Sequence, residues 1–378
     1  MENKYIPFCQ PMIGQEEIDE VVDTLKSGWL TTGPKTVRFE KMIAEYVGAK
    51  YAVAVNSCTA ALHLSLLALN IGPGDEVITT TFTFASTANV IVQVGATPVF
   101  VDINRDSFNI DPEKIRKAIT IRTKAIIPVH YGGQACDMDR IMEIAGEYKL
   151  AVIEDAAHAI GAEYKGRKIG TIGKATCFSF YVTKNLATGE GGAIATDDAD
   201  IAAKAEVLKL HGMNRDAWKR YSKKGNWYYE IEECGWKYNM MDIQAALGIH
   251  QIKKLDGFNR TRREYAGIYD QELSKIGGVV IPREMEYGKH IYHLYPILLE
   301  NADRAEFIEK MSANGVQCSV HFIPLHLQPY YRKNFGLKKE DFPNAQWVYE
   351  REVSLPLYPK MSRNDLDHVI HSVREVLR

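Results

Sequence analysis

Closely paired cysteines are missing from this sequence. Its 378 residues include six cysteines, and they form no Cys-x-x-Cys pair. A His-Glu-x-x-His stretch is missing as well, so a zinc site has little support and we expect no bound metal. Scattered thiols are typical of a reducing compartment rather than of a disulfide framework, and we therefore expect a cytoplasmic protein.

Long apolar runs and an excess of charge of one sign are also missing. No run is long and apolar enough to cross a bilayer, and residues 1–4 lack the apolar core of a signal peptide. Lys plus Arg total 46 and Asp plus Glu total 48, which gives a formal net charge of -2. A nucleic-acid binder normally carries a basic excess or a basic stripe. We therefore expect neither a membrane nor a nucleic acid as a partner.

Residues 50–200 alternate short apolar runs with longer helical patterns. The runs that we expect to be strands are Tyr51–Val55, Glu76–Thr81, Thr97–Ile103, Lys124–His130, Ala151–Asp155, Ala175–Phe180 and Ala193–Thr196. The helical patterns among them include Thr59–Asn70, Phe84–Val94, Pro112–Ile119 and Met138–Tyr148. Such alternation predicts a mostly parallel sheet covered by helices on both faces, a three-layer α/β/α fold.

The chain changes character after this region. A helix follows Asp198, residues 213–235 form a polar and aromatic excursion, and a long helical stretch with room for an interruption covers Asp242–Ile276. Short strands and two helices follow, before an amphipathic last helix over Arg363–Arg378. A chain of this length suits two domains. We predict a large domain over residues 1–250 and a smaller C-terminal α/β domain over residues 251–378.

Three of the expected strands lead into residues that can carry chemistry, and ligands of open parallel sheets bind beyond the carboxyl ends of strands. Asp155 ends one strand; a lone acid there is usually a cap or a solvated loop residue, but it can also face a buried cation. Lys184 lies between an aromatic strand and a glycine-rich turn, where desolvation would lower its pKa and make the neutral amine a nucleophile. Residues 56–63 open a helix whose free N–H groups could bind phosphate, although ordinary N-caps look the same.

The three places together match the needs of one cofactor, pyridoxal 5'-phosphate. This cofactor requires a lysine for covalent attachment, an acid against its pyridinium nitrogen and a cradle for its phosphate. The acid keeps the ring nitrogen protonated, so that the ring can accept electrons from a substrate carbanion. Asp155 and Lys184 follow successive main strands with one excursion between them, so the two strands are expected to be neighbours.

Seven stretches carry a resemblance to a known family. They occur in the family's order, span nearly the whole chain, and are Gly28–Pro34, Asn56–Leu69, Gly72–Asp102, Glu154–Gly161, Ser179–Gly192, Tyr238–Met240 and Leu355–Pro359. The sequence resembles the fold type I aminotransferases, specifically the DegT/DnrJ/StrS-like enzymes that make amino sugars for surface polysaccharides and antibiotics. The resemblance implies a pyridoxal-phosphate-dependent sugar aminotransferase.

The resemblance also implies roles around the cofactor ring. Lys184 would hold the cofactor covalently and shuttle the proton between substrate and cofactor carbons. Asp155 would pair with the pyridinium nitrogen, and His158 would lie near the ring hydroxyl, where some relatives have Gln. Phe84 would stack on the ring, where relatives often carry Trp or Tyr. Some relatives have His in place of the lysine and dehydrate sugars, so the presence of Lys184 favours transamination.

Further residues are implied for the phosphate. The backbone amides of Thr59 and Ala60 and the hydroxyl of Ser179 would hold it. Asn239 would reach it from the neighbouring subunit, so that a homodimer with shared active sites is expected.

The substrates follow from the same resemblance. It implies transfer of an amino group from L-glutamate to a nucleotide-linked keto sugar for surface polysaccharide or glycan synthesis. Residues 30–34 and the stretch 211–220 favour C4 of a UDP-linked 4-keto-6-deoxy sugar, while a dTDP-linked 3-keto or 4-keto sugar is the alternative. The candidate substrate contacts are Thr31, Thr32, Arg215, His321 and His326. Each also has an ordinary interpretation: a helix cap for the threonines, a solvated loop for Arg215 and its neighbour Arg220, and a structural histidine for the other two.

Two interpretations from other classes remain. A dinucleotide-dependent oxidoreductase would fit a doubly wound sheet, but no Gly-x-Gly-x-x-Gly turn follows the first strand. A non-catalytic regulatory protein could keep the cofactor fold, because a fold alone does not settle function.

Overall fold

A seven-stranded sheet forms the centre of the computed structural model, which describes residues 5–214 and 228–378. Its strand order is β1-β9-β8-β5-β4-β2-β3. The strands are β1 (Tyr51–Val55), β2 (Glu76–Thr80), β3 (Thr97–Val101), β4 (Thr123–Ile126), β5 (Ala151–Asp155), β8 (Ala175–Ser179) and β9 (Gly192–Thr196). β9 runs antiparallel to the other six strands, which are parallel to one another. The predicted mostly parallel sheet is confirmed.

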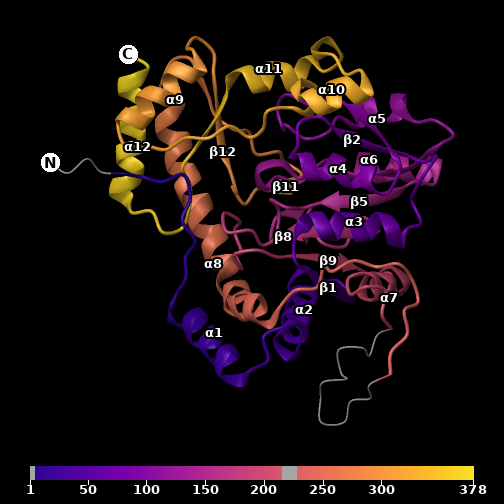
Figure 1. The fold of residues 1–378 in the computed structure, drawn as a ribbon. Coiled ribbons are helices and arrows are strands. Elements are labelled where there is room, and N and C mark those ends of the chain that lie inside the picture. The colour runs from indigo at the N-terminus through magenta and orange to yellow at the C-terminus, as the bar shows by residue number, and fades with distance from the viewer. Residues whose placement is uncertain (1–4, 215–227) are drawn as a thin grey trace.

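Helices cover both faces of this sheet (Figure 1). One face packs against α2 (Pro34–Val47), α5 (Pro112–Ala118), α6 (Met138–Tyr148) and the first half of α8 (Asp242–Leu273) in a single hydrophobic cluster. The other face packs against α3 (Cys58–Ala68), α4 (Ala85–Gln93) and α7 (Ala199–Leu208). The strands β2, β8 and β9 are buried along their whole lengths, as expected for a sheet that is covered on both faces. The chain therefore has the predicted three-layer α/β fold.

The C-terminal part builds a second, smaller α/β layer. A three-stranded antiparallel sheet joins β10 (Val279–Val280), β12 (Tyr295–Leu299) and β13 (Glu352–Leu355). The helices beyond α8 are α9 (Arg304–Ala313), α10 (Pro329–Phe335), α11 (Pro343–Arg351) and α12 (Arg363–Val376). The sequence predicted only two helices before the last one. α10 and α11 are 7 and 9 residues long, too short to show several turns of helical periodicity.

α8 is one continuous helix of 32 residues without the interruption for which the sequence left room. It runs from the sheet to the C-terminal layer (Figure 1). The predicted excursion begins with antiparallel pairing of Met213 with Ile231, so the described part of it resembles a hairpin. The excursion between β5 and β8 contains β6 (Glu163–Tyr164) and β7 (Arg167–Lys168), and β11 (Gly288–Lys289) from the C-terminal part pairs with β6 to complete a small three-stranded sheet.

The N-terminal segment crosses to the C-terminal layer before α1 (Gln15–Ser27) begins. Ile6 pairs with Val316 as a parallel bridge and joins the hydrophobic cluster of α8, α9 and α12. The division of the chain after residue 250 stays a prediction. Within the described residues, no helix is long and apolar enough to span a membrane.

Candidate active site

The carboxyl ends of β1, β5 and β8 meet at one edge of the central sheet. β5 and β8 are parallel neighbours with Asp155 opposite Cys177, as predicted, and β9 joins β8 to β1. A cavity of about 410 Å³ lies at this edge. The predicted residues that line it are Thr59, Phe84, Asp155, His158, Ser179, Lys184 and His321. Side chains far apart in the sequence are thus collected in one cavity.

Lys184 points its amine into this cavity from a turn that follows β8. The turn is closed by a hydrogen bond from the Lys184 amide to the Tyr181 carbonyl, at 2.8 Å. Burial lowers the pKa of Lys184 to about 8, although the thiols of Cys58 and Cys9 and the carboxyl of Asp155 act in the opposite direction. The amine therefore becomes neutral, and nucleophilic, far more readily than a surface lysine.

Asp155 lies at the floor of the cavity and is buried. Its carboxylate accepts hydrogen bonds from the Thr87 hydroxyl at 2.8 Å and from the Ala157 amide at 3.2 Å. Burial nevertheless raises the pKa of the Asp155 carboxyl, against the lowering effect of these two bonds and of the Lys184 charge. A buried carboxyl of this kind gains most from a cationic ligand such as a pyridinium ring.

The start of α3 offers backbone donors beside the lysine. Ser57 caps the helix by accepting the Ala60 amide at 3.1 Å, so Ala60 lies just behind the lining, whereas Thr59 and Ser179 belong to it. Gly192 lies so close that a Cβ atom there would be 2.5 Å from the Cys58 nitrogen. The backbone approaches closely here, which suits a helix N-terminus that receives an anion.

Aromatic rings form the mouth of the cavity. The Phe84 side chain is 64% exposed, so its ring is free to cover a planar ligand. His158 stacks on Phe322 with ring centroids 5.8 Å apart. Its Nδ1 accepts the Gly132 amide at 3.2 Å, and burial together with Lys184 holds the pKa of His158 well below its usual range. The neutral ring therefore carries its hydrogen on Nε2.

The two histidines predicted near the sugar differ in position. His321 lines the cavity and its Nδ1 lies 2.9 Å from the Ser354 hydroxyl, which in turn donates to the buried Glu352 carboxyl at 2.5 Å. His326 lies behind the lining, with its ring nitrogens at 3.0 Å from the Thr81 hydroxyl and 3.1 Å from the Gln346 side-chain carbonyl. His326 thus has the satisfied surroundings of a structural residue.

Thr31, Thr32 and Asn239 form a cluster of their own beside the start of α8. The Asn239 amide donates to the Thr32 hydroxyl at 2.7 Å, and this hydroxyl donates to the Met240 carbonyl at 2.6 Å. The Thr31 carbonyl accepts the Asp242 amide. Neither threonine caps α2, because the Asp242 carboxylate accepts the first free amides of that helix. Arg215 and Arg220 lie outside the described residues.

Several residues in the cavity or next to it were missed from the sequence. His293 has its Nε2 3.4 Å from the Lys184 amine, although the two residues are 109 positions apart. Phe8 from the N-terminal segment lines the cavity, and the Cys9 thiol donates to the Thr183 carbonyl at 3.5 Å. Buried Arg262 binds the carbonyls of residues 292, 293 and 357. None of them follows a strand end, the signal that pointed to Asp155 and Lys184.

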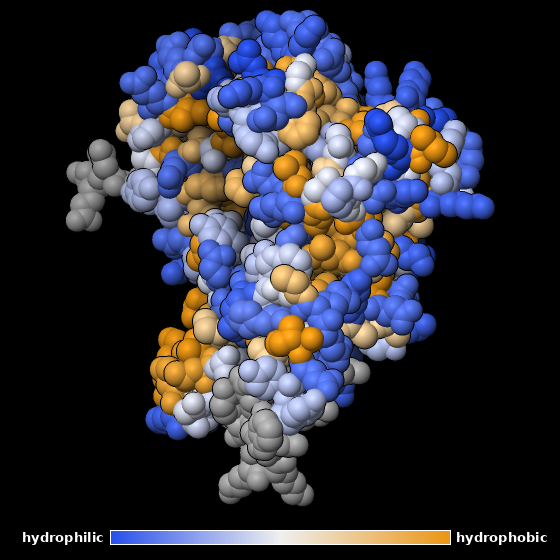
Figure 2. Space-filling model, turned by 45° about the vertical axis from the view of Figure 1, so that its right-hand side comes forward, coloured by the Kyte–Doolittle hydropathy of each residue, from blue (hydrophilic) through white to orange (hydrophobic). Residues whose placement is uncertain are grey.

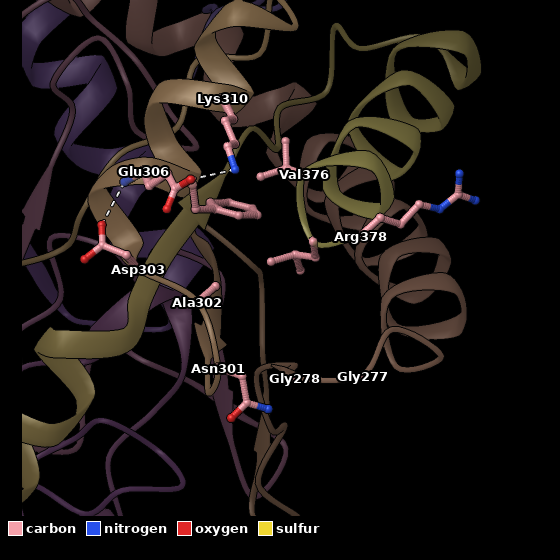
Figure 3. Close-up of a pocket in the computed structure, with 11 residues that line it drawn as sticks. Gly277, Gly278, Asn301, Ala302, Asp303, Glu306, Lys310, Val376 and Arg378 are labelled. Carbon is pink, nitrogen blue, oxygen red and sulfur yellow. Dashed lines mark hydrogen bonds and ion pairs between the residues drawn. The ribbon is translucent and has the colours of Figure 1, made fainter.

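A second depression lies between α9 and α12 (Figure 3). Three of its charged residues already interact with one another: Lys310 pairs with Glu306 at 2.7 Å, and Asp303 accepts the Glu306 amide at 2.9 Å. Figure 3 shows both interactions along one side of the depression. It offers no counterpart of the buried lysine and carboxyl, so the cavity at the sheet edge is the candidate active site.

A desolvated lysine amine, a buried carboxyl and a helix N-terminus at the edge of a parallel sheet are the groups that a pyridoxal-phosphate-dependent enzyme requires. The chain belongs to the DegT/DnrJ/EryC1/StrS aminotransferase family, whose model matches residues 11–374.

Three similar proteins support this membership. The spore coat polysaccharide biosynthesis protein SpsC of Bacillus subtilis is 54% identical over 381 residues, which covers 100% of this chain and 98% of SpsC. Spr1654 from Streptococcus pneumoniae, assigned as a sugar aminotransferase, has in its PMP-form a TM-score of 0.92 and 35% identity over 99% of this chain and 98% of its own. Helicobacter pylori PseC, an aminotransferase involved in the biosynthesis of pseudoaminic acid, has a TM-score of 0.92 and 30% identity over 99% of each chain. The chain is a sugar aminotransferase.

Proposed function

We propose that this enzyme transfers an amino group from L-glutamate to C4 of a UDP-linked 4-keto-6-deoxy sugar in the cytoplasm, for surface polysaccharide or glycan synthesis. The observation that carries the proposal is the desolvated Lys184 amine, which faces the same cavity of about 410 Å³ as the buried Asp155 carboxyl. The similarity to SpsC and PseC supports a sugar destined for a polysaccharide or a related glycan.

The residues of the cavity have separate roles in cofactor binding and proton transfer. Bound pyridoxal phosphate supplies an electron sink at the reacting carbon. Asp155 would hold the ring-nitrogen proton. The Nε2 hydrogen of His158, whose Nδ1 accepts the Gly132 amide, would be available to the ring hydroxyl, and the Thr59 and Ala60 amides and the Ser179 hydroxyl would bind the phosphate. The neutral amine of Lys184 takes a proton from one carbon and returns it to another, which its lowered pKa favours.

Phe84 completes the cofactor site by covering the ring. His321 and the two threonines at positions 31 and 32 remain proposed contacts of the sugar nucleotide. His321 has the better support, because it alone of these three lines the cavity of a single chain.

We further propose that two copies of this chain form a dimer with shared active sites, in which Asn239 reaches the phosphate in the partner. The cluster that contains Asn239 lies beside exposed apolar side chains at Leu30 and Met241. α1 adds Ile18, Val22 and Leu25, which are exposed along one helix face. An apolar patch is visible at the lower left of Figure 2, the end of the molecule that α1 occupies in Figure 1. Exposed apolar areas of this kind mark interaction surfaces.

Mixing two inactive variants tests whether the sites are shared. Asn239→Asp places a carboxylate against the phosphate and is expected to lower turnover about a hundredfold. When it is refolded together with Lys184→Ala, half of the dimers are mixed and each has one intact site, so about a quarter of wild-type turnover should return.

The matched control mixes Lys184→Ala with Asp155→Asn. Both substitutions lie in the cavity of their own chain, so no mixed dimer has an intact site and turnover should stay low. Equal recovery in the two mixtures, or none in the first although the chains dimerise, would contradict the shared site.

A substrate panel tests the sugar. UDP- and dTDP-linked sugars with a keto group at C4 or C3 are incubated with L-glutamate labelled with ¹⁵N, and the amino sugars are detected by mass. We expect the UDP-linked 4-keto sugar to be the best acceptor. Turnover of a 3-keto sugar alone would overturn the C4 assignment. A protein that shows the absorbance of bound cofactor but aminates no sugar would support the regulatory alternative.

A further inference from the structure

A chain of four hydrogen bonds leads from a backbone carbonyl to the Lys184 amine. Asn259 on α8 donates from Nδ2 to the Ile160 carbonyl at 3.3 Å. Asn185 donates from Nδ2 to Asn259 Oδ1 at 2.7 Å. Asn185 Oδ1 lies 3.0 Å from Nδ1 of His293, whose Nε2 lies 3.4 Å from Lys184 Nζ. All these side chains other than Lys184 are buried.

The carbonyl at the start fixes the direction of every bond in this chain. A carbonyl oxygen only accepts, so Asn259 must present its NH₂ group to Ile160 and its oxygen to Asn185. Asn185 must then present its NH₂ group to Asn259 and its oxygen to His293. A second carbonyl, that of Ile291, also faces Asn185 Nδ2 at 3.5 Å and requires the same orientation. Nδ1 of His293 therefore carries a hydrogen.

A neutral imidazole carries only one ring hydrogen. Burial holds the pKa of His293 well below its usual range, and the charge of Lys184 lowers it further. The ring is therefore neutral at physiological pH. Its Nε2 atom is then a hydrogen-bond acceptor that faces the lysine. The neighbouring His158, whose ring centroid is 4.4 Å away, has the opposite tautomer because its Nδ1 accepts the Gly132 amide.

We propose that His293 is a positioning residue, locked by Asn185 and Asn259 in the Nδ1–H tautomer, which holds the free Lys184 amine by accepting one of its hydrogens. An amine or an ammonium group can both donate to this acceptor, so the lysine keeps one place in the cavity in either protonation state. His293 is a weaker base than the lysine, so it accepts the hydrogen bond without taking the proton, and the lysine keeps its proton for the substrate. This use in proton transfer rests on the proposed function, whereas the tautomer does not.

Other groups around the amine affect its protonation but do not fix its position. The carboxyl of Asp155 and the thiols of Cys58 and Cys9 favour the ammonium form. Lys184 in turn lowers the pKa of each of the surrounding histidines, His158, His293 and His321. Among these groups, the structure records only His293 within hydrogen-bond distance of the amine.

The tautomer can be read directly. In the full chain labelled with ¹⁵N-histidine, protonated and unprotonated ring nitrogens have well-separated ¹⁵N shifts, and the His293 signals are assigned as those lost in His293→Gln. We expect hydrogen on Nδ1 and none on Nε2. Asn185→Leu removes the acceptor for the Nδ1 hydrogen of His293 and so breaks the chain of hydrogen bonds. This variant should introduce the Nε2–H form of the ring. A wild-type ring with hydrogen on Nε2, or with an even mixture, overturns the proposal, whatever the sugar panel shows.

The lysine provides a second readout. In the cofactor-free full chain, the pH dependence of acetylation at Lys184, followed by peptide mass spectrometry, gives the pKa of the amine, expected at about 8. His293→Leu removes the acceptor that stabilises the ammonium, so the midpoint should fall by roughly one pH unit. His293→Gln should restore the wild-type midpoint. The glutamine NH₂ group can donate to Asn185, and its side-chain oxygen then faces the lysine as an acceptor.

His63→Gln is the matched control, since His63 is a buried histidine on α3 whose ring contacts Trp236 and Tyr238. Its midpoint should equal that of the wild type. Equal midpoints in the wild type and in folded His293→Leu would overturn the proposal, and so would a failure of the glutamine to restore the shift. If the leucine variant does not fold, the wild-type ¹⁵N spectrum alone decides.

Discussion

Replacement of Lys184 by alanine is expected to abolish both covalent attachment of the cofactor and amino transfer. The amine faces the cavity, desolvation lowers its pKa to about 8, and the cavity contains no second lysine among its lining residues. Turnover should fall by at least about a thousandfold, since the variant loses its nucleophile and its general base together. The visible absorbance of the cofactor bound to the lysine should vanish with it.

Borohydride reduction of the wild type followed by peptide mapping provides the direct measurement. The adduct should be found on Lys184. Lys174→Ala is the control, because Lys174 directly precedes β8 but is exposed and pairs with Asp198. An adduct at another lysine, or turnover that survives in Lys184→Ala, would refute the assignment of this residue.

Asp155→Asn should cause the second largest loss. Asparagine keeps the size of the side chain and can still accept the Ala157 amide, but it has no charge to hold a proton on the pyridinium nitrogen. The ring becomes a poorer electron sink, so turnover is expected to fall by roughly a hundredfold or more. Steady-state rates and a titration of cofactor binding would measure both effects.

The control for this substitution is Asp139→Asn, an exposed carboxylate that pairs with Lys165 at 2.5 Å. Its turnover should match the wild type. Thermal unfolding of both variants separates loss of chemistry from loss of fold. A folded Asp155→Asn protein with wild-type turnover would mean that the carboxyl does not act on the cofactor.

The central sheet and its strand ends were predictable because both signals are local. A buried parallel strand is a short apolar run, and the polar residue that follows it lies at the sheet edge. This reasoning led to Asp155 and Lys184, and the structure brings the two into one cavity. The parallel pairing of β5 with β8 followed from the same pattern.

The rest of the site depends on contacts that sequence periodicity does not encode. His293 lies between two short strands, β11 and β12, and reaches Lys184 only because the C-terminal layer folds back against the sheet. Phe8 and Cys9 arrive from the opposite end of the chain. His326 resembled His321 in the sequence, yet the packing of its ring on Phe342 places it outside the cavity. Such assignments require the tertiary structure.

The length of α8 has a thermodynamic consequence. Its 32 residues extend about 48 Å. Ala245, Ile249, Ile252 and Leu255 complete the core beneath the sheet, while Ala266, Tyr269 and Leu273 complete the core of the C-terminal layer. Unfolding of either layer would therefore remove part of the hydrophobic core of the other, because α8 belongs to both cores. The two layers are expected to share a single cooperative transition instead of unfolding in succession.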